Sequence, residues 1–250
     1  MKNIKISIIT VCLNAGDSLE KTILSVKSQT YTNYEYIIID GKSIDNTADI
    51  IKKYSDDISK WESKHDKGIY DAMNKGIMLA SGEWLIMMNA GDIFADNQVL
   101  EKVFSKEYDE HHKFLYGDYW HKMENGRLVL RFTSYENGIL NHQSVIYKKE
   151  LHKEHGMYIV TDKLIISDYL FFIRIPSVNV LKLDFPISIY DNKGISNQGS
   201  WALIQSSCAN VVFRRKSFSQ MLLYIYLKKI KSLIPISLKD KLKLILKINE

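Results

Sequence analysis

Three polar residues in the first half of the chain, Asn14, Asp40 and Asp92, each come directly or shortly after an apolar run. An aspartate in such a position can hold Mg²⁺ or Mn²⁺ against a diphosphate, and it can also accept hydrogen bonds from a base or a ribose. A turn or a helix cap explains each residue when it is taken alone. Their repeated position after apolar runs favours one shared binding site.

A fourth acidic residue, Asp168, lies in the largely apolar segment Leu164–Phe172. Burial there would raise the basicity of its carboxylate, as a general base requires, whereas an ordinary helix N-cap is the alternative. His142 fits either a satisfied polar residue or a functional one. We expect His111 and His112 at a solvated helix end.

The segments that must position these residues alternate between strand and helix patterns. Apolar runs predict strands, and apolar residues at helical spacing predict helices: strands at Ile4–Leu13, Tyr36–Ile39 and Trp84–Met88, and helices at Ser18–Thr30, Ser43–Tyr54, Asp66–Ala80 and Asp168–Ile175. This alternation predicts a mainly parallel sheet, and in such sheets ligands bind beyond the carboxyl ends of the strands. The polar residues that follow the strands should therefore converge on one crevice.

Two common nucleotide-binding motifs do not fit the sequence. The segment Asp40-Gly41-Lys42-Ser43 lacks the earlier glycine of a phosphate loop, because Tyr36 stands in that place. No G-x-G-x-x-G pattern follows the first predicted strand, which argues against a dinucleotide site.

Charge is distributed unevenly along the chain. The net charge is +5, and from Arg214 to Glu250 ten basic residues stand against two acidic ones, so this tail carries +8 and the remainder −3. We expect basic amphipathic helices over residues 201–250 that bind an anionic membrane surface rather than nucleic acid, or that pack on the body. Two distant cysteines, with no recognisable signal peptide or spanning segment, predict a cytoplasmic protein.

Taken together, these segments resemble the family 2 glycosyltransferases of the GT-A fold, especially the bacterial branch that builds O-antigen, capsule and other surface polysaccharides. The likeness extends from about Lys5 to Ser196. It is carried by short segments in a fixed order: Ile6–Asn14, Ser25–Tyr31, Ile39–Thr47, Asp66–Gly76, Ser81–Trp84, Asn89–Asp92, His142–Ser144 and Ser167–Phe172.

The resemblance implies an α/β GT-A architecture, which is Rossmann-like, with a mainly parallel sheet and helices on both faces, plus C-terminal amphipathic helices. Residues 1–115 would form the nucleotide-sugar-binding half, residues 116–200 the acceptor-binding half, and residues 201–250 the basic helices.

The resemblance also implies roles for single residues. Asp168 would be the catalytic base, and Asp92 the contact of Mg²⁺ or Mn²⁺. His142 and Gln143 would bind the acceptor. The nucleotide-sugar would be bound by residues that follow the first strands: Thr10, Val11, Asn14, Asp40, Gly41, Asp66, Lys75, Asn89 and Gly91. Many relatives carry acidic residues where Gly41 and Gly91 stand here.

The implied function is that of an inverting, metal-dependent glycosyltransferase that works on the inner face of the cytoplasmic membrane. It would move a sugar from a nucleotide-sugar, with UDP-sugars favoured, to a saccharide or a polyprenyl-diphosphate-linked saccharide. A sugar-phosphate nucleotidyltransferase is one alternative, although Cys12–Asp17 contains no basic residue to handle a triphosphate. A catalytically degenerate GT-A binding module is the other.

Overall fold

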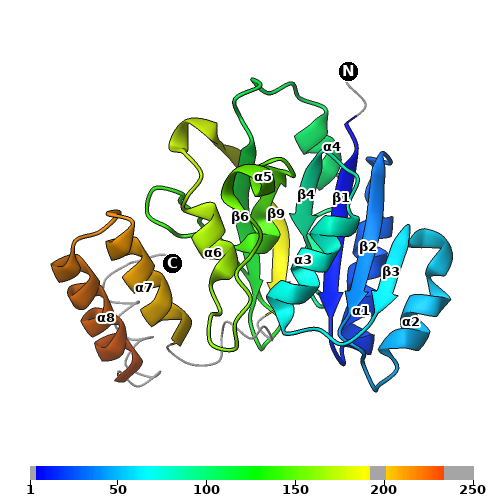
Figure 1. Cartoon of the computed structure of the whole chain (residues 1–250), viewed down its shortest axis with the longest axis horizontal. Coiled ribbons are helices and arrows are strands. Elements are labelled where there is room, and N and C mark those ends of the chain that lie inside the picture. Colours follow the sequence, from blue (N-terminus) through cyan, green and yellow to red (C-terminus); the bar gives the residue numbers. More distant parts are fainter. Residues whose placement is uncertain (1–3, 192–200, 234–250) are drawn as a thin grey trace. The chain divides into compact units, whose positions relative to one another are not determined.

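The computed structural model describes residues 4–191 and 201–233 (Figure 1). The chain divides into two compact units, Met1–Gly199 and Ser200–Glu250. The division of the first unit into a donor half and an acceptor half concerns function and stays a prediction.

Four parallel strands form the first part of the sheet. They are β1 (Ile6–Cys12), β2 (Tyr34–Asp40), β3 (Lys60–Ser63) and β4 (Trp84–Met87), in the order β3-β2-β1-β4. Every residue of β1 is buried, because helices cover both faces of a central parallel strand and leave no solvated side.

The second part of the sheet is mixed. Its strands are β5 (Ile93–Phe94), β6 (Phe114–Lys122), β7 (Leu128–Arg131), β8 (Val145–Lys148) and β9 (Val180–Asp191). β8 lies between β4 and β6 and is antiparallel to both. β6 and β9 are parallel neighbours. β5 pairs antiparallel with β9, and β7 pairs antiparallel with β6. The parallel strands of the predicted α/β sheet are confirmed, and the antiparallel pairings are confined to the second part of the sheet.

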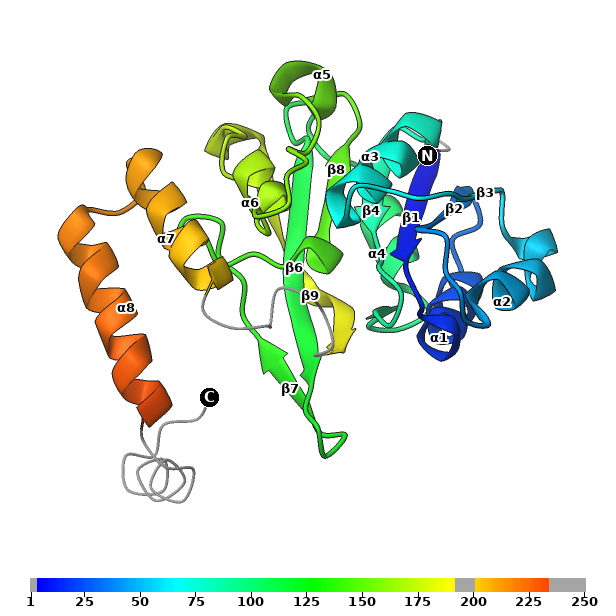
Figure 2. The same ribbon diagram turned by 60° about the horizontal axis from the view of Figure 1, so that its bottom comes forward.

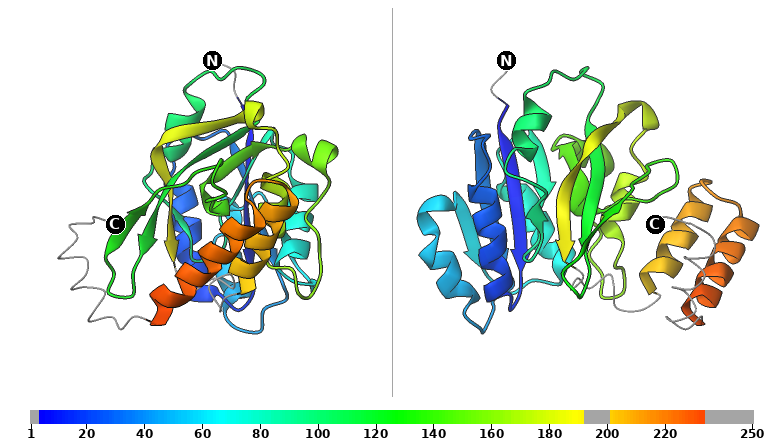
Figure 3. Two further views of the ribbon diagram at one scale, coloured as in Figure 1. Left: turned by 90° about the vertical axis from the view of Figure 1, so that its left-hand side faces the viewer. Right: turned by 180° about the vertical axis from the view of Figure 1, so that it is seen from behind.

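Helices cover both faces of the sheet because alternate residues of each strand point to opposite sides. Ile6 and Ile8 of β1 pack in one apolar cluster, while Ile9 and Val11 pack in the other. The first cluster contains residues of α1 (Gly16–Lys27), α2 (Thr47–Lys53) and α4 (Val99–Phe104); the second contains residues of α3 (Ile69–Leu79), α5 (Leu151–His155) and α6 (Ser167–Phe172). Figure 1 shows α3 in front of the sheet, and Figure 3 shows α1 in front when the molecule is seen from behind.

Three 3₁₀ turns complete the first unit: η1 (Ser55–Asp57), η2 (His142–Ser144) and η3 (Ser177–Asn179). Of these, η2 positions site residues. It begins where the side chain of Asn141 accepts a hydrogen bond from the backbone N–H of Gln143, and it leads directly into β8.

The second unit contains α7 (Trp201–Val212) and α8 (Phe218–Leu233), which lie side by side (Figure 2). The helices predicted over this region are present up to Leu233, and the helix expected to begin at Ser237 lies outside the described residues. Within residues 4–191 and 201–233, no helix is both long enough and apolar enough to cross a membrane.

Candidate active site

The loops that follow β1 and β2 are tied to each other at the carboxyl edge of the sheet. The backbone N–H of Asn14 donates to Ser43 Oγ at 2.7 Å, and the side-chain oxygen of Asn14 accepts from the N–H of Ile44 at 2.9 Å. Asn14 has a φ of 49°, a conformation that asparagine tolerates better than most residues do. The predicted convergence of these two loops is therefore present.

Asp40 is fully buried beneath these loops. Its carboxylate accepts hydrogen bonds from the hydroxyls of Ser43 and Ser63, each at 2.5 Å, and from the backbone N–H of Ser43 at 3.2 Å. These bonds tie the end of β2 to the loop that follows it and to the last residue of β3. A contact between Asp40 and a nucleotide stays a prediction.

Thr10 and Val11 direct their side chains into the two apolar layers. The hydroxyl of Thr10 donates to the carbonyl of Met88 at 2.6 Å and lies 2.9 Å from the hydroxyl of Tyr36, so it joins β1 to the end of β4. Val11 packs on the face covered by α3. Both side chains shape the core beneath the predicted pocket, and their contact with a nucleotide stays a prediction.

The side chain of Asp66 lies against Gly41. A Cβ atom on Gly41 would approach Asp66 Oδ2 to 2.7 Å, so a larger residue at position 41 would displace this carboxylate. Asp66 Oδ1 accepts from the N–H of Gly68 at 2.9 Å, which fixes the turn before α3. A carboxylate therefore lies beside position 41 although the residue there is glycine.

Lys75 points toward the same turn from inside α3. Its Nζ donates to the carbonyl of His65 at 3.0 Å and forms an ion pair with Asp71 at 3.2 Å. These contacts brace the start of α3, and the predicted binding of nucleotide-sugar by Lys75 stays a prediction.

The loop Asn89–Asp92 follows β4 and is held by α1. Gly91 has a φ of +104°, and its N–H donates to Thr22 Oγ1 at 2.9 Å. The same hydroxyl donates to the carbonyl of Asp92 at 2.8 Å. Asp92 is buried, and its Oδ2 accepts from Gln143 Nε2 at 2.5 Å, so the predicted metal contact and one predicted acceptor contact touch each other.

The side chain of His142 joins the same loop to Asp168. Nε2 of His142 lies 2.9 Å from Asn89 Nδ2, and its Nδ1 lies 3.1 Å from Asp168 Oδ2. The other carboxylate oxygen of Asp168 accepts from the hydroxyl of Tyr70 at 2.8 Å. Asn89, His142, Asp168 and Tyr70 thus form one continuous hydrogen-bonded chain across the sheet.

The pKa of Asp168 lies below its ordinary value. Burial raises this pKa, but the hydrogen bond and charge of His142 and the hydrogen bond from Tyr70 outweigh it. The expected net rise in the basicity of Asp168 is therefore wrong, because the helix that carries Asp168 is packed where two donors reach its carboxylate. Burial, and next the charge of Asp168, raise the pKa of Tyr70, so its phenol keeps the proton that it donates.

Tyr70 is the member of this chain that the sequence did not disclose. It lies at the start of α3 with its ring in the apolar layer, and its position in the sequence fits the helical spacing of the apolar core residues of α3. Asp168 lies 98 positions further on, and no local pattern links two such residues.

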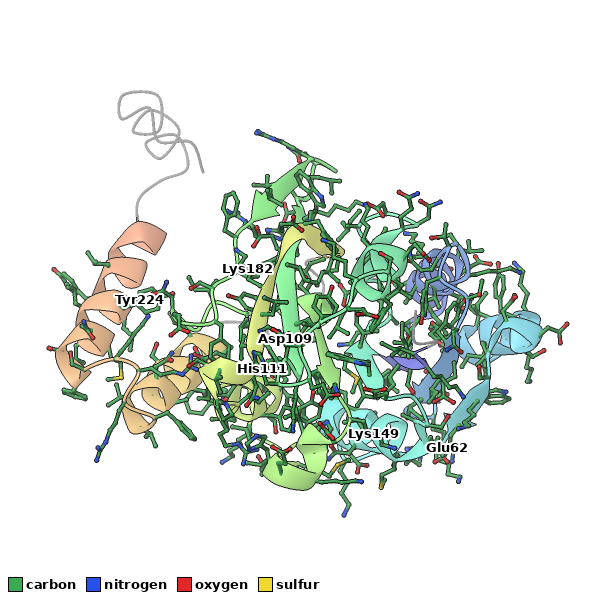
Figure 4. The ribbon with its side chains drawn as sticks, turned by 90° about the horizontal axis from the view of Figure 1, so that it is seen from above. Glu62, Asp109, His111, Lys149, Lys182 and Tyr224 are labelled. Carbon is green, nitrogen blue, oxygen red and sulfur yellow. The ribbon has the colours of Figure 1, made fainter. Side chains whose placement is uncertain are left out.

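A second group of potential metal ligands lies away from this loop. One ligand atom each of Asp109, His111 and His112 lies within 4.8 Å of the others. Figure 4 labels Asp109 and His111 of this group. They occupy a turn between α4 and β6, not the predicted helix end. Because β6 runs antiparallel to β8 and β8 antiparallel to β4, this turn lies at the opposite edge of the sheet from Asp92.

Comparisons with known proteins agree with this fold. The family model "Glycosyl transferase family 2" matches residues 7–221. A PGL/p-HBAD biosynthesis glycosyltransferase of Mycobacterium bovis (strain BCG / Pasteur 1173P2) is 31% identical over 177 residues, which cover 67% of this chain and 68% of the relative. The Escherichia coli UDP-Glc:alpha-D-GlcNAc-diphosphoundecaprenol beta-1,3-glucosyltransferase WfgD is 29% identical over 175 residues, 68% of this chain and 65% of the relative.

Two solved structures show the same fold at low sequence identity. S. aureus TarS 1–349 in complex with UDP has a TM-score of 0.66 at 18% identity, over 84% of this chain and 65% of that one. The mannosyltransferase PcManGT of Pyrobaculum calidifontis, in complex with GDP-Man and Mn²⁺, has a TM-score of 0.65 at 14% identity, over 82% and 64%. The chain belongs to glycosyltransferase family 2, and its first unit has the predicted GT-A fold.

Proposed function

We propose that this glycosyltransferase moves a sugar from a nucleotide-sugar, with UDP-sugars favoured, to a saccharide carried on polyprenyl diphosphate, in the synthesis of a surface polysaccharide. The observation that supports this most is the chain from Asn89 through His142 to Asp168, which joins a partly buried carboxylate to the loop of Asp92. The substrates named for WfgD and the UDP bound to TarS support the choice of donor and acceptor class.

Asp168 acts as the base in this proposal. Its carboxylate takes the proton of an acceptor hydroxyl while that oxygen attacks the anomeric carbon of the donor. The bond from the anomeric carbon to the diphosphate oxygen breaks in the same step, and the nucleoside diphosphate leaves with the electron pair. A single displacement of this kind inverts the configuration at the anomeric carbon.

Asp92 would hold Mg²⁺ or Mn²⁺. Beside its carboxylate lies Gln143 Oε1, a buried oxygen with no hydrogen-bond partner among the described residues, and oxygen atoms of this kind are the ligands that both ions prefer. Few protein ligands suffice for Mg²⁺, because water and substrate phosphates complete its coordination shell. A bound ion would supply charge neutralisation for the leaving diphosphate.

The test of the proposed function is transfer activity with matched variants. We expect the purified chain to transfer sugar from a UDP-sugar to a synthetic lipid-diphosphate saccharide in the presence of Mn²⁺. Asp168→Asn should lower kcat by about 10²- to 10⁴-fold and leave donor affinity, measured by calorimetry, close to that of the wild type. Near-normal transfer by this variant would remove Asp168 from the role of base.

Membrane binding by the second unit forms part of the same proposal. Large apolar side chains of α8 are exposed, including Phe218, Leu222 and Leu223, and the basic run Arg214–Lys216 precedes the helix. Such a surface suits an anionic bilayer, where a polyprenyl-linked acceptor resides.

The measurement is sedimentation of the full chain with phosphatidylglycerol vesicles and, as a control, with phosphatidylcholine vesicles. We expect binding only to the anionic vesicles. It should weaken as salt rises and when Arg214, Arg215 and Lys216 are replaced by glutamine. Binding that is indifferent to lipid charge, salt and these replacements would contradict the membrane assignment.

A further inference from the structure

The turn between α4 and β6 gathers three metal-binding side chains that the proposed reaction does not use. The ligand atoms of Asp109, His111 and His112 lie within 4.8 Å of one another, and the centroids of the two histidine rings are 4.1 Å apart. Within residues 4–191 and 201–233, none of these three side chains forms a hydrogen bond or an ion pair. Their lone pairs are therefore available to a ligand.

His112 contributes an unsatisfied nitrogen to this group. Its Nδ1 is buried and has no hydrogen-bond partner among the described residues, although a buried polar atom normally has one. Either ring nitrogen of a neutral histidine can bind a metal ion through its lone pair. An ion bound at Nδ1 would give this atom the partner that the described protein groups do not provide.

The backbone of the turn is held in place independently of these side chains. The N–H of His112 donates to the carbonyl of Asp109 at 2.9 Å, and Asn179 Nδ2 donates to the carbonyl of His111 at 2.7 Å. The N–H of Lys113 donates in turn to the carbonyl of Asn179 at 2.9 Å. These bonds tie the turn to η3, so the binding of an ion has to order side chains only, which lowers its entropic cost.

The ligand atoms at this turn differ in kind from those beside Asp92. Two imidazole nitrogens and one carboxylate oxygen suit Zn²⁺, whereas the oxygens of Asp92 and Gln143 suit Mg²⁺ or Mn²⁺. Ligand atoms that share a tetrahedral zinc ion lie about 3.4 Å apart, so the three side chains at the turn have to approach one another by roughly 1 Å. Asp109 and His111 are exposed, so their side chains have room to rotate by this amount.

We propose that Asp109, His111 and His112 form a second metal site, which binds Zn²⁺ through three protein ligands and a water molecule. The turn precedes β6 at the edge of the sheet opposite Asp92, so the ion acts on stability and not on the transfer step. Because the three ligands are gathered only in the folded chain, Zn²⁺ stabilises the first unit. This inference does not depend on the proposed function.

Calorimetry of the full chain, without a histidine tag and stripped of metal by a chelator, tests the site with Zn²⁺ as titrant. Mg²⁺ in large excess keeps Zn²⁺ from the proposed site at Asp92. We expect one Zn²⁺ per chain. His111→Asn and His112→Asn should each weaken binding by at least about tenfold, since even the loss of a residue that only orients a ligand has an effect of that size. The control His65→Asn removes an exposed histidine elsewhere and should leave the affinity unchanged.

Thermal unfolding provides a second readout. Zn²⁺ at about 100 times its Kd should raise the Tm of the wild type by roughly 5–10 °C. The same concentration should leave the Tm of His111→Asn almost unchanged, and circular dichroism verifies that this variant is folded. Asp109→Asn, which keeps the size of the side chain, should also weaken Zn²⁺ binding. A wild type that binds no Zn²⁺ under these conditions, or Zn²⁺ binding that survives both histidine substitutions, would overturn the inference.

Discussion

Glu35 offers a stability prediction whose size follows from its surroundings. This buried residue of β2 accepts hydrogen bonds from Ser7 Oγ at 2.6 Å, Ser81 Oγ at 3.0 Å and the N–H of Gly82 at 3.1 Å, and Lys60 Nζ lies 3.3 Å away. Burial raises the pKa of Glu35, but the hydrogen bonds from Ser7 and Ser81 and the contact with Lys60 lower it from 4.5 to about 2.

The depressed pKa makes Glu35 a pH-dependent source of stability. At about 1.4 kcal/mol per pKa unit, the shift corresponds to about 3 kcal/mol in the free energy of unfolding. Because the folded-state pKa is the lower one, this stability is fully present above pH 4.5 and is lost as the pH falls toward 2. Glu35→Gln should therefore be less stable than the wild type by about this amount at pH 7, and the gap should narrow at pH 3.

Urea denaturation of both proteins between pH 7 and pH 3, followed by circular dichroism, measures this gap. Groups that titrate alike in both proteins cancel in the difference. Glu83→Gln provides the control, because Glu83 pairs with Lys148 at 3.2 Å but remains 54% exposed. A gap that stays constant across this pH range would refute the reasoning, since the hydrogen bonds would then stabilise the charged and neutral forms of Glu35 equally.

Three further predictions concern single positions. In Gly82→Ala the new Cβ would lie 2.6 Å from the backbone nitrogen of Ser7, so we expect a loss of about 1–3 kcal/mol in urea denaturation. In Gly91→Ala the φ of +104° becomes strained although space is available, so we expect a loss of about 1–3 kcal/mol, and an unchanged midpoint would contradict the strain argument. Gln143→Leu removes the unpaired oxygen beside Asp92 and should weaken Mn²⁺ binding in an electron paramagnetic resonance titration, whereas Gln143→Glu should strengthen it.

The parallel part of the sheet could be predicted from the sequence because its strands are buried on both faces. A run such as Ile6–Cys12 is apolar throughout, so it belongs to a central strand that is buried on both faces. The polar residues that follow such a run therefore lie at the carboxyl ends of the strands. Helix starts were less predictable. The helix expected from Asp66 begins at Ile69, because Asp66 uses its carboxylate to close the turn at Gly68.

Side-chain partners within the site could not be predicted, because they depend on the packing of distant elements. The pattern around Asp168 indicated an apolar environment, and the side chain is partly buried, yet the direction of its pKa depends on His142 and Tyr70, which approach from η2 and α3. A hydrophobic pattern reports which face of a helix is buried, and it does not report which polar groups lie opposite that face.

Gly41 and Gly91, where the family resemblance leads us to expect acidic residues, are explained by different physical causes. Gly41 leaves room for the carboxylate of Asp66, so negative charge at this place is kept by a residue from another loop. Gly91 is free of close neighbours, and its φ of +104° is what excludes other residues. An acidic residue introduced at position 91 would therefore change the turn that presents Asp92, whereas one introduced at position 41 would compete with Asp66 for the same space. In the proposed site the metal would be held by Asp92 and by the oxygen that Gln143 brings from η2, a residue outside the sequence motif around Asp92.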